Sequence, residues 1–240
     1  MENKISLIGF VFVVSICGLV SCGTTEKQPG FTYSPQPGNK EVAAKYAIYA
    51  MMAAESYHAE KKIKFPLDLA GWNRVDFNGN KTDDPGADHW FTGLSYDIFE
   101  KQNSNNVVIA FRGTDSKWDY FVSNLTPFIS PGYKQAKKEV LEYKDAHPDK
   151  KVIVVGHSLG GGIALSVSVW NGVNAYTFDS SPRIFDGLGD HIEPAERVLI
   201  FQKGEVLEKF RQKLPKVSEV VPDKNIFEFA FNFKIGRAHV

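Results

Sequence analysis

The residues whose types and spacing best suit covalent chemistry are Gly156, Ser158 and Gly160, which form the pattern G-x-S-x-G. The β-branched run 152–155 before them is typical of a buried strand, and the small apolar residues 161–169 after them suit a packed helix. A serine on so sharp a turn adopts a strained backbone, so the residues two before and two after it must be small. The pattern predicts a nucleophilic Ser158; the alternative is a glycine-rich corner without chemistry.

The helix expected after Ser158 offers a partner for this chemistry. The first N–H groups of a helix have no intrahelical carbonyl to bond, and they lie at the positive end of the helix dipole. The N–H of Leu159 is one of them. We therefore predict that Leu159 stabilises the negative oxygen formed when a serine attacks an ester carbonyl.

A serine nucleophile needs a base, and three of the six histidines are poor candidates for that role. His147 is expected in a loop at the opposite end of the strand that leads to Ser158. His157 is adjacent to the serine, so its ring is expected to point away from the site. His89 lies beside Trp90 before a predicted strand, and a structural role is expected for it.

The elements that position these residues follow from the hydrophobic patterns. Apolar and polar residues alternate in segment 93–100, and segment 105–112 is mostly apolar. The two segments flank a turn at Asn103, so they are predicted to pair as a hairpin. Further strands are predicted at 173–178, 197–202 and 225–234, and helices at 41–61 and 133–145.

The composition excludes several classes of function. The formal net charge is zero, and the lysines of segment 134–144 alternate with glutamates as on a solvated helix face, so no nucleic-acid partner is expected. The acidic residues of the turn-rich segment 63–88 fit no calcium-loop pattern. No metal or other cofactor is expected, and the oligomeric state is left open.

The N-terminus resembles a secretion signal. Residues 1–21 carry Lys4 and then an apolar run too short to span a bilayer comfortably, and the following Cys22 completes a sequence similar to the lipobox of bacterial lipoproteins. Acylation of Cys22 would tether the protein to a membrane of the bacterial cell envelope, either the outer membrane or the cell surface. The alternative is an ordinary signal peptide or membrane anchor.

The remaining chain is predicted to form one domain. Residues 22–40 are rich in Gly, Thr, Pro, Ser and Gln and are expected to be a flexible tether. Residues 41–234 are long enough for a single domain with a sizeable core. Cys17 leaves with the signal and Cys22 is acylated, so no cysteine is expected to remain for a disulfide or for thiol catalysis.

Three motifs in order resemble the class 3 lipase family, the fungal-lipase-like branch of the α/β-hydrolases. They are VVIAFRGTDS at 107–116, GHSLGGGIAL at 156–165 and TFDSSPR at 177–183, with Trp118-Asp119 and Asn124-Leu125 between the first two. The resemblance spans about Tyr46 to Phe233. It implies an α/β fold with a mostly parallel central sheet flanked by helices, truncated at its C-terminus.

The resemblance also implies roles for the residues after the second strand of the hairpin. Thr114 follows Arg-Gly and corresponds to the family's second oxyanion donor, through its N–H and hydroxyl. A plain strand-ending turn is the alternative. The apolar segment 115–131 corresponds to the family's lid, which would suit a lipid substrate, although a buried connecting helix explains it equally well.

Two acids compete for the place of the triad acid. The family has its aspartate after the strand at 197–202, where Glu205 stands in this sequence, and a glutamate can orient a histidine as well. Most members have glycine where this sequence has Asp179. Asp179, with His191 twelve positions later, is therefore the alternative, and Glu205 is preferred.

The order serine, acid, histidine requires a histidine after Glu205, and only His239 satisfies it. His239 lies in the ending IGRAHV at 235–240, which can be encoded by ATC GGA AGA GCA CAC GTC, the start of a common sequencing adapter. We therefore interpret 235–240 as a non-native tail and expect the natural chain to continue through a histidine and a closing helix. Sequencing the locus tests this: a genomic frame that reads IGRAHV and then stops would contradict it.

These residues predict a serine hydrolase of lipid esters, either triacylglycerols or phospholipids, that acts through an acyl-enzyme on Ser158. The alternative is a surface lipoprotein that keeps the hydrolase fold for binding and is catalytically impaired. The departures at Asp179 and Glu205, together with the non-native interpretation of His239, are the support for that alternative.

Overall fold

The computed structural model describes residues 31–33, 39–57, 65–84, 87–89, 92–113, 131–181, 193–204, 207–208, 212, 217, 221, 225–231 and 233–235. Several predicted features lie outside these residues: the signal segment 1–21, Cys22, Thr114, nearly all of the lid segment 115–131, His191, Glu205 and His239. Their assigned roles therefore stay predictions.

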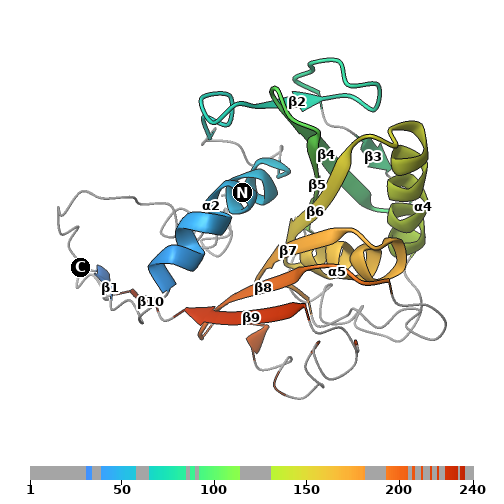
Figure 1. The fold of residues 1–240 in the computed structure, drawn as a ribbon. Helices are drawn as coiled ribbons and strands as arrows, with labels where there is room; N and C mark the ends of the chain where they lie inside the picture. The colour runs from blue at the N-terminus through green and yellow to red at the C-terminus, as the bar shows by residue number, and fades with distance from the viewer. Residues whose placement is uncertain are drawn as a thin grey trace, which may run out of the picture.

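The described part of the domain is built on one eight-stranded sheet (Figure 1). Its strands in spatial order are β2 (Trp72–Val75), β4 (Leu94–Lys101), β5 (Asn106–Phe111), β6 (Lys151–His157), β7 (Asn174–Phe178), β8 (Arg197–Gln202) and β9 (Ile226–Phe231), with β3 (Ala87–His89) pairing β4. The strands from β5 to β9 are parallel, whereas β2, β3 and β4 pair antiparallel. The predicted α/β fold with a mostly parallel sheet is therefore present.

Helices cover both faces of this sheet (Figure 1). Helix α2 (Asn39–Glu55) packs its alanines, Tyr46 and Met52 on one face, against residues such as Phe99 and Val155. Helices α4 (Pro131–Ala146) and α5 (Leu159–Asn171) pack on the other face. The central strands are consequently buried on both sides, which explains their continuous runs of apolar residues.

The predicted elements largely match the structure. Strands β4 and β5 form the predicted antiparallel hairpin, with Ile98 opposite Ile109. The alternating segment 225–234, predicted as one strand, is divided: β9 ends at Phe231, opposite the last residue of β8, and Phe233–Ile235 form β10. Strand β10 pairs with β1 (Phe31–Tyr33) in a separate two-stranded sheet, so a short strand lies within the predicted tether.

Within the described part of the chain, no helix has the length and the apolar character needed to cross a membrane.

Candidate active site

Ser158 stands on the turn between β6 and α5 in a backbone conformation that few residues adopt. Its φ of 55° and ψ of −123° lie outside the regions favoured by L-amino acids. The turn is held from both sides: the Ser158 N–H donates to the Phe178 carbonyl at 3.1 Å, and the Ser158 carbonyl accepts from the N–H of Ser181 at 2.8 Å. The predicted strand, sharp turn and helix are confirmed, and the strain they impose is localised at the serine.

The glycines on either side of Ser158 allow the chain to fold back on itself. A Cβ on Gly156 would collide with the carbonyl group of Gly160, and a Cβ on Gly160 would lie within 3.0 Å of the Phe111 carbonyl and the backbone carbon of Arg112. The start of α5 therefore rests on the end of β5. Both glycines are required by backbone contact and not by a positive φ.

We predict that Gly160→Ala destabilises the protein by about 3 kcal/mol or more, because its methyl group would overlap backbone atoms of β5 that cannot move aside cheaply. Gly71→Ala is the matched control. Gly71 has a φ of 76° and no atom within 4 Å of an added Cβ, so only the backbone conformation is penalised, by about 1–2 kcal/mol. Urea unfolding of both variants measures the difference. Equal losses of stability in the two variants would show that the backbone contact between Gly160 and β5 does not exclude a side chain.

The end of β5 lies beside this turn. Phe111 is paired with Gly156 across the two parallel strands, and the N–H of Arg112 donates to the Ser95 carbonyl at 2.9 Å. Gly113 is buried, and an added Cβ there would lie 2.9 Å from the His157 carbonyl. Gly113, the last described residue before segment 114–130, therefore lies next to the serine turn. Leu159, directly after Ser158, is the first residue of α5.

Asp179 follows β7 and is tied to the neighbouring strand. It is buried, has a φ of 43°, and one of its carboxylate oxygens accepts the N–H of Gln202 at 2.6 Å. Gln202 is the last residue of β8, so the Asp179 carboxylate joins the carboxyl ends of β7 and β8. A positive φ is most easily adopted by glycine, and the hydrogen bond to Gln202 is what the aspartate side chain adds at this position.

The chain that leads to Glu205 leaves the same edge of the sheet. Lys203 donates its N–H to the Phe231 carbonyl at 2.8 Å, and Gly204 turns the chain with a φ of 84°. Strand β8 is two places from β6 in the sheet order, and both strands end at the same edge because they run parallel. Gly204, the last described residue before Glu205, therefore lies just beyond the edge of the sheet that carries Ser158.

The described histidines occupy structural positions, as the sequence indicated. His147 follows α4 at the opposite end of β6, where its Nε2 lies 2.8 Å from the Phe77 carbonyl oxygen. His89 pairs through Nε2 with Glu139 at 2.7 Å. His157 is buried, and its Nδ1 lies 3.0 Å from the hydroxyl of Tyr57.

Burial lowers the pKa of His157 from 6.5 to about 4, so the ring is neutral in the folded protein at neutral pH. Unfolding restores the ordinary pKa, and the unfolded chain then binds the additional proton between these two values. The contribution of His157 to stability is therefore complete above pH 6.5 and is lost as the pH falls toward 4.

We predict that, between pH 7 and pH 4.5, the free energy of unfolding falls by about 2 to 3 kcal/mol more in the wild type than in His157→Asn. Asparagine retains a polar atom near the place of Nδ1 but does not titrate. Urea unfolding at a series of pH values gives the two curves. Parallel curves would show that His157 is not the source of the acid sensitivity.

One neighbour of the serine turn was not predicted from the sequence. Tyr57 lies just beyond α2, and its hydroxyl contacts both His157 and Gly113. Tyr46 and Tyr49 of α2, by contrast, pack into the core. The sequence contains no signal for Tyr57, because its partner is 100 positions away.

Among the described residues, no three side chains of His, Cys, Asp or Glu lie close enough together to hold a metal ion.

The mostly parallel sheet, the helices on both of its faces and the strained serine between β6 and α5 define an α/β-hydrolase. Residues 48–192 match the model of the Tle-like phospholipase domain, a phospholipase-like family. The chain therefore belongs to this family, whose members are carboxylic ester hydrolases of the lipase and phospholipase type.

Individual relatives are distant. The extracellular phospholipase A1 of Serratia liquefaciens is 28% identical over 163 residues, which are 66% of this chain and 47% of the relative, so the chain spans about half of that protein's length. Among solved structures, lipase II of Rhizopus niveus is 15% identical with a TM-score of 0.48, covering 79% of each chain. The lipase of Rhizopus microsporus var. chinensis is 17% identical with a TM-score of 0.48, covering 80% of each chain.

Proposed function

We propose that the protein hydrolyses carboxylic esters of phospholipids through an acyl-enzyme on Ser158. The observation that carries this proposal is the backbone of Ser158, held at a φ of 55° and a ψ of −123° between a buried strand and a helix N-terminus. Strain of this kind persists where the surrounding structure enforces it, and it keeps the hydroxyl clear of its own backbone.

The reaction runs in two stages. The Ser158 hydroxyl gives its proton to a histidine oriented by Glu205, and its oxygen attacks the ester carbonyl carbon. The N–H groups of Leu159 and Thr114 stabilise the negative oxygen of the tetrahedral intermediate. When this intermediate collapses, the bond to the lysophospholipid oxygen breaks, and that oxygen takes the proton from the histidine. Water then attacks the acyl-enzyme by the same route and releases a fatty acid.

The base in this scheme is a histidine that follows β9. His239 holds that place in the given sequence, within the tail interpreted as non-native. In the natural chain, we expect the histidine that replaces it to approach from the carboxyl end of β9, which lies next to β8.

Phospholipids are favoured over triacylglycerols because of the family and because the curated relative is a phospholipase A1. The test uses vesicles of a phosphatidylcholine with different acyl chains at sn-1 and sn-2, in parallel with a triacylglycerol emulsion. We expect the natural full-length protein to release mainly the sn-1 fatty acid and a lysophospholipid. Hydrolysis of the emulsion alone, or release of phosphocholine, would contradict the assignment.

A further inference from the structure

The hydroxyl of Tyr57 lies between the ends of β5 and β6. It is 3.0 Å from Nδ1 of His157 and donates to the His157 carbonyl oxygen at 3.4 Å. It also covers Gly113: an added Cβ on Gly113 would collide with this hydroxyl and lie 3.2 Å from the tyrosine Cζ. One hydroxyl thus touches the residue before Ser158 and the residue before Thr114.

The position of this hydroxyl is fixed from behind by the end of α2. Tyr57 donates its N–H to the Ala54 carbonyl at 3.3 Å, and Ser56 donates its N–H to Met52 at 3.2 Å and its hydroxyl to Ala53 at 2.8 Å. The turn after the helix is therefore closed, and Tyr57 has little freedom to move independently of α2.

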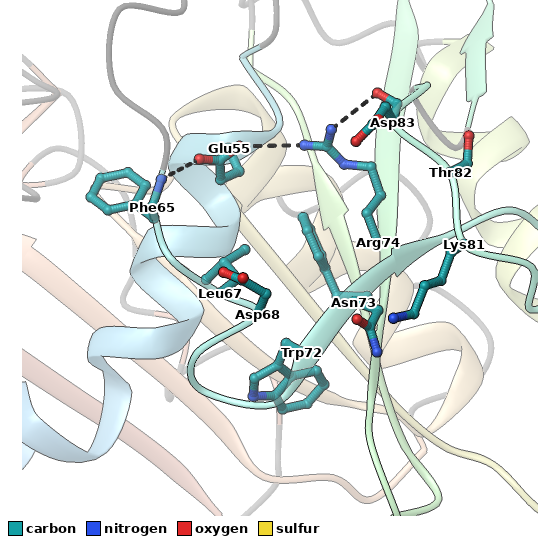
Figure 2. Close-up of a pocket in the computed structure, with 11 residues that line it drawn as sticks. Glu55, Phe65, Leu67, Asp68, Trp72, Asn73, Arg74, Lys81, Thr82 and Asp83 are labelled. Atoms are coloured by element: carbon teal, nitrogen blue, oxygen red, sulfur yellow. Dashed lines mark hydrogen bonds and ion pairs between the residues drawn. The ribbon is translucent and has the colours of Figure 1, made fainter.

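The end of α2 is itself anchored to the sheet by charged groups. Glu55 accepts the N–H of Phe65 at 2.6 Å and lies 3.4 Å from Arg74 of β2, which also lies 3.2 Å from the fully buried Asp97 of β4. Figure 2 shows Arg74 extending from β2 toward Glu55 at the end of the helix. These ion pairs are largely shielded from solvent, so separating one partner would leave the other charge buried and unpaired. The pairs therefore hold the end of α2 in place.

We propose that Tyr57 is a positioning residue for the ester hydrolysis proposed above: its hydroxyl holds the end of β5 against the end of β6 and so sets the spacing of the two oxyanion donors. The inference rests on the proposed function, because Thr114 and Leu159 supply those donors in it. Tyr57 acts through Gly113 and His157, and it does not itself contact the reacting atoms.

A hydrogen-bond donor that is misplaced by a fraction of an ångström stabilises the oxyanion much less. Because the oxyanion forms only on the way through the transition state, this loss raises the barrier to the chemical step. Without the hydroxyl, Gly113 faces a gap and His157 loses a hydrogen bond. The chemical step is therefore expected to suffer, whereas substrate affinity is not.

The test compares Tyr57→Phe with the control Tyr46→Phe in the natural full-length protein, using the vesicle assay. Tyr46 is also on α2, and its hydroxyl donates to Glu196 at 3.1 Å, away from the serine turn. We expect Tyr57→Phe to lower kcat about 10-fold or more with KM within about twofold. Its melting temperature is expected to change no more than that of Tyr46→Phe. The rate of inactivation by a fluorophosphonate is expected to fall in the same proportion as kcat.

Three results would overturn the inference. If kcat of Tyr57→Phe stays within about twofold of the control, the hydroxyl does not position the site. If KM rises with kcat unchanged, Tyr57 contacts the substrate instead. If the wild type neither hydrolyses the vesicles nor reacts with the fluorophosphonate, the proposed function itself fails, which is distinguishable because the first two results require an active wild type.

Discussion

The Ser158→Ala protein is expected to fold normally and to lose kcat by at least about 10⁴-fold, because the oxygen that forms the acyl-enzyme is removed. Alanine has no greater difficulty than serine at a φ of 55°, so stability should change little. Steady-state hydrolysis of a p-nitrophenyl ester by the natural full-length protein measures the loss, and circular dichroism confirms the fold.

Ser166→Ala is the matched control for that experiment. Ser166 is a buried serine of α5, the helix that begins directly after Ser158, and its hydroxyl donates to the Gly162 carbonyl at 3.0 Å. Its replacement should leave kcat within about twofold of the wild type, since it lies away from the turn. Full turnover by Ser158→Ala, or equal losses in both variants, would exclude Ser158 as the nucleophile.

Replacing Glu205 with glutamine is expected to lower kcat by about 10⁴-fold, because a glutamine can no longer stabilise the histidine when it becomes charged. Asp179→Asn is expected to lower kcat less than about 10-fold. Its carboxylate accepts the Gln202 N–H, which indicates that it joins β7 to β8. An asparagine oxygen still accepts that N–H, so the loss of stability should be about 1 kcal/mol.

The two variants are compared by the pH dependence of kcat/KM together with urea unfolding. The opposite pattern, with a large kinetic loss in Asp179→Asn and a small one in Glu205→Gln, would make Asp179 the triad acid.

The features that the sequence predicted correctly depend on short stretches of chain. The β-branched run before Gly156, the two glycines and the small residues after Ser158 specify a strand, a tight turn and a helix within nineteen residues, 151–169. The hairpin of β4 and β5 is equally local, because its turn separates the two strands by only a few residues.

The features that the sequence did not reveal depend on contacts between distant segments. The hydrogen bond of Tyr57 to His157 joins residues 100 positions apart, and that of Asp179 to Gln202 joins residues 23 apart. The alternation over 225–234 predicts one strand, but β9 ends at Phe231, opposite Gln202, the last residue of β8. No periodicity encodes such information, because it arises only when the sheet assembles.

The central claim is that Ser158 carries the acyl group, and the most direct test is to trap it. The natural full-length protein is treated with a fluorophosphonate, digested with trypsin and analysed by mass spectrometry. The account predicts a single phosphonyl adduct on Ser158 within the peptide 152–183, absent from Ser158→Ala and present in Ser166→Ala. An unmodified Ser158, or an adduct on another residue, would contradict it.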